Sequence, residues 1–330
     1  MLILAKAVLS MMIGFIISVV LGAITIPLLK KMNVKQNVST YLEKKHHEKD
    51  GTPTMGGIIF IIPTIITTII LLLTGKLEMT HNLGIVMFVF IAYAILGFID
   101  DFLIIKRGNN LGLTEFQKLA GQLIIALIFF YIFMKSGADP SLDIYTFGIK
   151  INMGWFYGIF LLFMLVASSN AVNITDGLDG LAGGLSLMAF LALGLISWNS
   201  GAISGSEDMA VFCFILVGTL LGFLLYNTHP ARVFMGDTGS LSLGATLASV
   251  AILTKHEITF IVIMGVFIFE TLVCIIQTLS MVLFRKKVFL MTPFHHHLEK
   301  LGWHERDIVK FFWVIGIILS MSAIIFGVWI

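Results

Sequence analysis

Residues 83–107 read LGIVMFVFIAYAILGFIDDFLIIKR, an apolar run that leads directly into two aspartates, Asp100 and Asp101. A run of this length is typical of a helix that crosses the hydrocarbon core of a bilayer, which is about 30 Å thick. An ionised carboxylate costs about 2.5 to 3.5 kcal/mol at the centre of such a helix on insertion scales, so acids gathered at its end indicate a functional site. The stretch therefore predicts a membrane helix with a polar site at one end.

Apolar runs of this kind recur along the whole chain, which has 330 residues, 58% of them hydrophobic and 12% charged. The expected spans are residues 7–29, 56–73, 83–99, 117–134, 155–172, 182–198, 209–226, 239–254, 258–284 and 309–329. We therefore predict an all-α integral membrane protein with about ten transmembrane helices, in which residues 1–330 form a single domain. The ninth span is long for a bilayer, so we expect it to bend or to protrude into the cytoplasm. Alternating apolar residues within 136–152 predict a short outer hairpin.

Lysine and arginine are unevenly distributed between the loops. An even number of spans places both termini on one side, and alternate loops then hold sixteen basic residues against five. The positive-inside rule makes the crowded side cytoplasmic and both termini extracytoplasmic. The net charge of +2 is too small to argue for nucleic acid as a partner. Cys213 and Cys274 lie inside apolar spans and suggest neither a disulfide framework nor a zinc site.

In this orientation five aspartates lie at the cytoplasmic ends of spans, namely Asp100, Asp101, Asp176, Asp179 and Asp237. Neighbours on a helix point about 100° apart, so Asp100 and Asp101 should serve different partners, one a metal and the other a proton. The alternative is a pair of solvated carboxylates at a helix C-terminus. The helix dipole disfavours anions there, which favours the functional interpretation.

Residues 170–184 read NAVNITDGLDGLAGG and open the sixth span. Asn173, Asp176 and Asp179 are spaced three apart, so a helical turn would place them on one face. The glycines leave room for a ligand near the backbone, and a helix N-terminus favours phosphate oxygens. An aspartate that caps the helix would explain one of these carboxylates but not the pair.

Three further segments carry candidate chemistry. In 227–240, NTHPARVFMGDTGS, Asp237 precedes the eighth span, where a helix-capping role is an alternative. Phe234 beside Gly236 would be ordinary packing in most membrane loops.

Residues 293–302 read PFHHHLEKLG. Three successive histidines of a regular helix cannot all bind one metal, so they are better suited to phosphate oxygens. The alternative is a solvated, histidine-rich loop. In KDGTPTMGG, Lys49, Thr52 and Thr54 form a possible phosphate cradle without Walker A spacing, although such lysines also serve as anchors.

Electrostatics connects these segments. A diphosphate near several aspartates would meet a repulsion of about 4 kcal/mol per pair of unit charges at 4 Å and an effective dielectric of 20. A divalent cation removes this repulsion, and carboxylate, water and phosphate oxygens are the ligands that Mg²⁺ prefers. We therefore expect metal-assisted phosphoryl transfer at the cytoplasmic face of the membrane.

The segments GTPTMGG, GFIDD, NAVNITDGLDGLAGG, ARVFMGDTGS and PFHHHLEKLGW together resemble those of the phospho-N-acetylmuramoyl-pentapeptide transferases (translocase I, MraY), within the polyprenyl-phosphate hexosamine-1-phosphate transferase superfamily. The resemblance spans nearly the whole chain. It implies a ten-helix, usually dimeric enzyme of the bacterial inner membrane that moves phospho-MurNAc-pentapeptide from UDP-MurNAc-pentapeptide to undecaprenyl phosphate. The implied products are lipid I and UMP, the implied cofactor is Mg²⁺, and the implied process is peptidoglycan synthesis.

The resemblance also implies roles for individual residues. Asp237 resembles the magnesium ligand, Asp100 the aspartate proposed to deprotonate the lipid phosphate, and Asp101 its essential neighbour. Asn173, Asp176 and Asp179 resemble residues around the nucleotide and the metal, and Asn227 and Phe234 resemble residues near the uracil. Further site-lining positions are Lys49, Thr54, Lys118, Gly236, Gln277, His295, His296 and His297, with His295 also a catalytic candidate. Our hypothesis is direct attack by the lipid phosphate, and an aspartyl intermediate is the alternative.

Two rival functions are open at this point. A sister transferase of the superfamily would use similar aspartates for an N-acetylhexosamine 1-phosphate, but the TPTMGG and PFHHHLEK segments favour the muramoyl-pentapeptide enzyme. An ion-coupled transporter would carry acids near the bilayer midplane, where Glu270 is the candidate.

Overall fold

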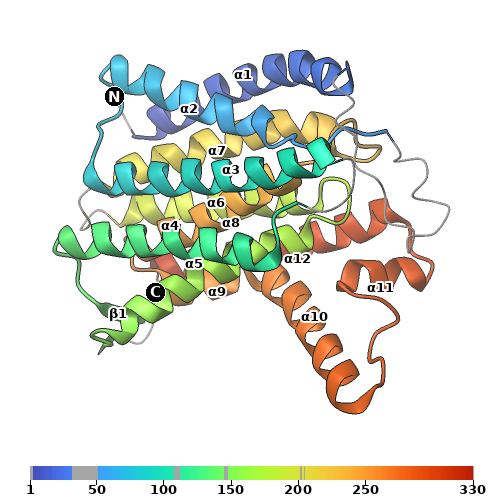
Figure 1. Cartoon of the computed structure of the whole chain (residues 1–330). Helices are drawn as coiled ribbons and strands as arrows, with labels where there is room; N and C mark the ends of the chain where they lie inside the picture. The colour runs from blue at the N-terminus through green and yellow to red at the C-terminus, as the bar shows by residue number, and fades with distance from the viewer. Residues whose placement is uncertain are drawn as a thin grey trace.

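The computed structural model describes residues 3–31, 51–107, 112–144, 148–200, 203 and 205–329. These residues form a helical bundle with one two-stranded hairpin (Figure 1). The helices are α1 (Ile3–Lys31), α2 (Ile58–Leu73), α3 (His81–Arg107), α4 (Glu115–Lys135), α5 (Phe156–Thr175), α6 (Leu181–Asn199), α7 (Ser206–Asn227), α8 (Gly236–Leu253), α9 (Glu257–Ile263), α10 (Gly265–Phe284), α11 (Phe294–Lys300) and α12 (Glu305–Ile324), which is followed by the π-helical η3 (Ile325–Trp329).

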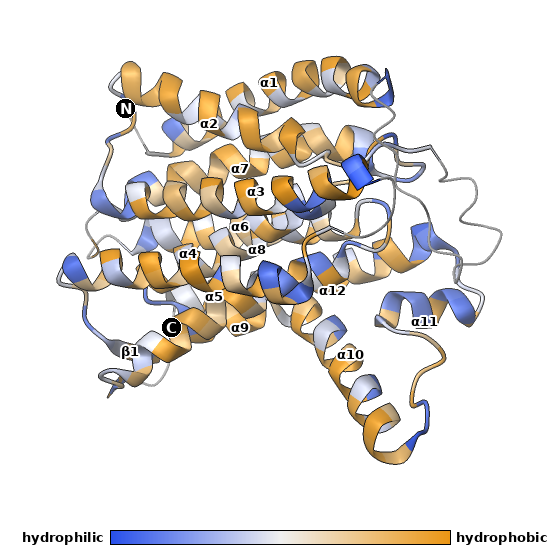
Figure 2. Ribbon diagram, in the orientation of Figure 1, coloured by the Kyte–Doolittle hydropathy of each residue, from blue (hydrophilic) through white to orange (hydrophobic). Residues whose placement is uncertain are grey.

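Each of the ten expected spans falls on a helix, and the ninth is divided between α9 and α10 at Met264. Among the described residues, eight helices are long and apolar enough to cross a membrane, and α2 is a shorter apolar helix. Figure 2 shows hydrophobic residues dominating the bundle, with hydrophilic residues concentrated at its ends. The chain is therefore an all-α, multi-pass membrane protein, as the apolar runs predict.

Helix α8 differs from the spans that face lipid. Every residue from Thr238 to Leu253 is buried, because α8 packs between α3, α5 and α6. Its sequence, GDTGSLSLGATLASVAIL, is rich in the small residues that let helix backbones approach closely. Since α8 contacts protein on all sides, it does not need a strongly apolar surface, and its polar first turn can lie inside the bundle.

The bend that we expect in the ninth span is present. The α9 segment ends at Ile263, and α10 then leans away from the bundle (Figure 1). Helix α10 ends before Arg285, whose φ of 54° reverses the chain toward α11. This geometry brings the histidine-rich α11 back toward the bundle.

The predicted hairpin is also present. Strands β1 (Ser141–Ile144) and β2 (Ile149–Asn152) pair antiparallel, with Ser141 opposite Asn152 and Ile144 opposite Ile149. The hairpin lies toward the end of the bundle where α1 begins, and η3 ends toward the same end (Figure 1). We call this the hairpin end. The extracytoplasmic position of both termini stays a prediction.

Candidate active site

The site begins where α3 ends against the start of α8, at the end of the bundle opposite the hairpin. A Cβ atom on Gly97 would lie 2.1 Å from the carbonyl oxygen of Asp237, and one on Gly57 would lie 2.5 Å from the backbone nitrogen of Gly239. Only glycine permits both contacts, so α2 and α3 can touch the first turn of α8 directly. This packing places Asp100 and Asp101, one turn after Gly97, beside Asp237.

Asp101 holds the N-terminus of α8. Its Oδ1 accepts the backbone N–H of Asp237 at 3.1 Å, and its Oδ2 accepts the backbone N–H and the hydroxyl of Thr238 at 2.9 and 2.6 Å. Asp101 is buried, and a carboxylate at this position satisfies helix N–H groups that have no partner within the helix. Asp101 is thus a cap supplied by another helix, and it orients Asp237.

Asp237 and Asp100 share one lysine. The Lys118 ammonium lies 2.5 Å from Oδ2 of Asp237 and 3.3 Å from Oδ2 of Asp100. Asn173 donates to Oδ1 of Asp237 at 2.7 Å, and the backbone N–H of Leu113 donates to Oδ1 of Asp100 at 2.7 Å. The Asp237 side chain is 18% exposed and that of Asp100 only 4%, so Asp237 offers the more accessible oxygens. As their 100° separation predicts, Asp100 and Asp101 face different partners.

Ligand atoms of Asp100, Asp101 and Asp237 all lie within 4.8 Å of one another, an arrangement that could hold a metal ion. Hydrogen bonds from α8 already occupy both oxygens of Asp101. Asp237 and Asp100 contact the ammonium of Lys118, which lies at the end of a long, flexible side chain. They are therefore better metal ligands than Asp101. A set made only of carboxylates suits Mg²⁺ and is a poor match for zinc.

The expectation that Asn173, Asp176 and Asp179 share one helical face is wrong. Helix α5 ends at Thr175 with Asp176 as its C-cap, and α6 begins only after Gly180, whose φ is 82°. The intervening residues form a turn, so the helical spacing does not extend across them. Asn173 reaches Asp237 from the last turn of α5, whereas Asp179 faces elsewhere.

Asp179 belongs to a second cluster. Its Oδ2 accepts the backbone N–H of Ala231 at 3.0 Å and lies 3.1 Å from Nδ1 of His229, while its own N–H donates to Glu305 Oε1 at 2.7 Å. Asp179, His229 and Glu305 also have ligand atoms within 4.8 Å of one another. Sequence reasoning missed His229 and Glu305, because neither residue stands in a pattern that distinguishes it from a solvated loop residue.

The segments 53–57 and 233–236 pair through their backbones. Gly56 N–H donates to the Phe234 carbonyl at 2.7 Å, and Phe234 N–H donates to the Pro53 carbonyl at 2.8 Å. Thr54 is buried here, and a Cβ atom on Gly236, whose φ is 73°, would lie 2.8 Å from its hydroxyl. Phe234 remains half-buried beside the acidic cluster. The structure therefore brings Thr54, Phe234 and Gly236 together.

Asn227 is a buried connector. Its Oδ1 accepts the N–H of Gly180 at 3.1 Å, and its Nδ2 donates to the Val233 carbonyl at 3.0 Å. The amide thus fixes the start of α6 against the loop that carries Phe234. Lys49, the lysine of the expected phosphate cradle, lies outside the described residues.

The three histidines of α11 have three different surroundings, as expected for successive positions of one helix. His295 is fully buried, and a Cβ atom on Gly177 would lie 2.2 Å from its Nε2. His296 lies 2.6 Å from Glu299, and His297 accepts the N–H of Leu290 at 3.1 Å through Nδ1. His295 therefore packs directly against the turn that follows α5.

Glu270 explains the placement of His295. This fully buried residue of α10 accepts the backbone N–H of Phe294 at 2.6 Å and that of His295 at 3.2 Å. Its Oε1 also lies 3.3 Å from Nδ1 of His295, although the ring is not in hydrogen-bonding geometry. Glu270 thus caps α11, which gives this acid a structural reason to lie in an apolar helix.

Gln277 has a comparable role about two turns further along α10. Its Oε1 accepts the N–H groups of Val288 and Phe289, each at 3.0 Å, and its Nε2 donates to the Phe289 carbonyl at 3.2 Å. The amide secures the loop between α10 and α11, so any effect of Gln277 on a ligand passes through that loop.

Comparison with known proteins defines the class of protein to which this fold and site belong. The model of glycosyl transferase family 4 matches residues 82–255, which include the acidic cluster, so the chain is a polytopic membrane transferase. A phospho-N-acetylmuramoyl-pentapeptide-transferase signature matches residues 49–61. Enzymes named phospho-N-acetylmuramoyl-pentapeptide-transferase are 47% identical in Geobacillus thermodenitrificans (98% of each chain) and 43% identical in Bacillus subtilis (97% of this chain and 98% of the relative). The chain belongs to the phospho-N-acetylmuramoyl-pentapeptide-transferase family.

Proposed function

We propose that this protein transfers phospho-MurNAc-pentapeptide from UDP-MurNAc-pentapeptide to undecaprenyl phosphate, with Mg²⁺ as cofactor, and releases lipid I and UMP in peptidoglycan synthesis. The observation that carries the proposal is the meeting of Asp100, Asp101 and Asp237 at the end of a membrane bundle, with Lys118 between Asp100 and Asp237. Membership of the family supplies the substrate class.

Charge is the reason for the metal. Lys118 contacts two of the three clustered carboxylates, so the cluster carries an excess of negative charge that would repel a diphosphate. Bound Mg²⁺ would neutralise this charge and polarise the phosphoryl oxygens. Asp237 would hold it, while Asp101 keeps Asp237 oriented through the first turn of α8 and Asp100 is left for proton transfer.

Two residues next to Asp237 are suited to the reacting phosphates. Lys118 can pass from the carboxylates to a phosphate oxygen, because its ammonium sits at the end of a flexible chain. Asp100 is the proposed proton acceptor for the lipid phosphate, which then attacks the diphosphate directly. The remaining residues position these groups.

We assign the nucleotide to the half-buried Phe234 and the neighbouring turn that contains Asp176 and Asp179. An aromatic ring at the edge of an acidic cluster can stack on a base, an interaction worth about 1 to 3 kcal/mol. Buried Asn227 supports this arrangement, since it ties the Phe234 loop to the start of α6. His295, held by Glu270, closes the site from the side of α11.

The membrane context follows from the same proposal. Undecaprenyl phosphate dissolves in the bilayer, so the reaction takes place at the membrane surface, and we place it at the cytoplasmic face of the bacterial inner membrane by the positive-inside rule. We further propose a homodimer as the working state, and a single transferase domain over residues 1–330.

The test is UMP release by the purified protein with undecaprenyl phosphate and Mg²⁺, with UDP-MurNAc-pentapeptide and UDP-N-acetylglucosamine offered in parallel. Turnover of the muramoyl substrate alone is expected. Turnover of UDP-N-acetylglucosamine alone would assign the chain to the sister transferases, and no turnover of either substrate would reopen the transporter hypothesis.

A further inference from the structure

At the hairpin end, far from the acidic cluster, two cavities meet. One has a volume of about 630 Å³ and is lined by polar groups that include His81, Lys135 and Asp139. The other has a volume of about 350 Å³ and is lined mainly by apolar side chains of α3 and α4. Thr80 and His81 line both cavities, so the polar and apolar spaces adjoin.

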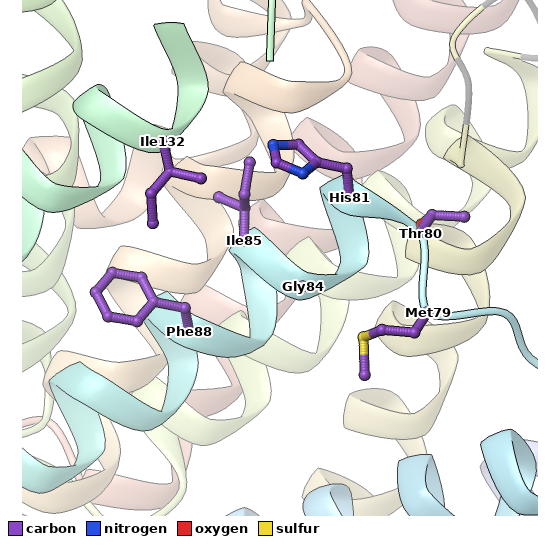
Figure 3. Close-up of a pocket in the computed structure, with 7 residues that line it drawn as sticks. All are labelled: Met79, Thr80, His81, Gly84, Ile85, Phe88 and Ile132. Carbon is purple, nitrogen blue, oxygen red and sulfur yellow. The ribbon is translucent and has the colours of Figure 1, made fainter. Parts of the chain in front are cut away.

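Figure 3 shows the apolar cavity. His81, Ile85 and Phe88 of α3 point toward Ile132 of α4, and Gly84 contributes no side chain to the space between the two helices. Because both helices have lipid-exposed faces nearby, an acyl chain can enter this space from the bilayer. Exposed aromatic residues at the same end, Tyr131 and Trp155, are typical of the level of the lipid headgroups.

The side chains that line the polar cavity include two cations, Lys135 and Lys255, and one carboxylate, Asp139. Asp139 is paired with Lys150 at 2.5 Å, so it does not neutralise other groups. Lys255 donates to the carbonyls of Asp139 and Ser141 and to the Tyr157 hydroxyl, which uses all three of its N–H donors. Within the described part of the chain, Lys135 has no carboxylate partner, and its ammonium lies 5.2 Å from the centre of the Tyr131 ring.

We propose that these joined cavities form a binding site for an anionic phospholipid, with the phosphate against Lys135 and His81 and an acyl chain between α3 and α4. The polar volume suits a headgroup, the adjoining apolar volume suits part of a chain, and the unpaired lysine selects negative charge. This site is separate from the acidic cluster, so the proposal does not depend on the proposed reaction.

The experiment is native mass spectrometry of the full-length protein in detergent, after lipid removal and addition of phosphatidylglycerol or phosphatidylcholine. We expect a bound phosphatidylglycerol and little phosphatidylcholine. Lys135→Gln should lower phosphatidylglycerol affinity by about fivefold, the effect expected for one lysine near an anionic headgroup. Lys76→Gln, which removes a lysine of the α2–α3 connection that lines neither cavity, is the matched control and should leave the affinity unchanged.

A second variant tests the acyl chain. A Cβ atom on Gly84 meets only Met79 Sδ, at 4.0 Å, so the backbone has room for a side chain here and Gly84→Leu places one in the apolar cavity. We expect at least about a tenfold loss of phosphatidylglycerol binding, because the new side chain replaces several buried methylenes of the lipid. Ile128→Phe, on an exposed part of α4, is the size control. Equal binding of both lipids, unchanged binding after Gly84→Leu, or binding of inorganic phosphate in place of the lipid would each overturn the proposal.

Discussion

Each end of the bundle contains a lysine–aspartate ion pair, and the two pairs have the same N···O distance but different surroundings. Lys118 and Asp237 are 2.5 Å apart in the acidic cluster, and Lys150 and Asp139 are 2.5 Å apart at the hairpin end. The first pair is 15% and 18% exposed and stands beside two further carboxylates, whereas the second is 61% and 48% exposed. A short contact distance therefore does not indicate a functional site. Burial of the pair, together with an excess of charge around it, does.

The largest effect is expected from Asp237→Asn. The amide loses the charge that would bind Mg²⁺, so turnover should fall on the order of 10³-fold or more while the protein still folds. The measurement is UMP release at saturating Mg²⁺. Asp139→Asn is the matched control at the other end and should retain full turnover. Near-native turnover of Asp237→Asn would remove this residue from the site.

The next effect concerns the cap of α11. Glu270→Ala leaves the N–H groups of Phe294 and His295 without their acceptor inside the bundle, and we expect a destabilisation of about 1 to 3 kcal/mol. Turnover should fall as well, because His295 loses its support. Thermal unfolding in detergent and UMP release measure the two effects. Glu270→Gln keeps one acceptor and should lie between wild type and alanine; an unchanged melting temperature for Glu270→Ala would contradict the capping role.

A smaller and more selective effect is expected from Phe234→Ala. If the ring stacks on the uracil, the affinity for the nucleotide substrate should weaken by about 1 to 3 kcal/mol, with little change in stability because the residue is half-buried. Equilibrium binding of UMP is the measurement. The same affinity in variant and wild type would return Phe234 to a packing role.

The smallest effect is expected from Lys150→Gln, which breaks the exposed pair at the hairpin end. The hydrogen bond from Lys150 lowers the pKa of Asp139 below its usual value, yet both side chains are largely in water. Neither turnover nor the melting temperature should change beyond experimental error. A loss of activity would show that the two ends are coupled, against the comparison drawn above.

The sequence predicts the spans well because hydropathy reports directly on contact with lipid. All ten segments coincide with helices, and even the bend in the ninth is anticipated from its length. Hydropathy predicts a span less clearly where the helix is buried among other helices and does not contact lipid. Helix α8 falls outside the set of long, strongly apolar helices, because its neighbours in the bundle take the place of lipid.

The acidic cluster was partly predictable and partly not. Asp100, Asp101 and Asp237 stand at span ends, where charge is costly without a role, so their position alone makes them candidates. The spacing of Asn173, Asp176 and Asp179 predicts helix where the structure has a turn at Asp176–Gly180, since a spacing of three does not reveal where a helix stops. The roles of Glu270 and Glu305 depend on backbone N–H groups distant in the sequence, and no local pattern reports such contacts.

The measurement that tests the account most directly is metal binding at the acidic cluster. Mn²⁺, a paramagnetic substitute for Mg²⁺, would be titrated into the purified protein and followed by electron paramagnetic resonance for wild type, Asp237→Asn and Asp139→Asn. The account predicts a bound ion in wild type and in Asp139→Asn, and loss of that ion in Asp237→Asn. Equal binding by all three proteins would contradict the assignment of Asp237 as the metal ligand.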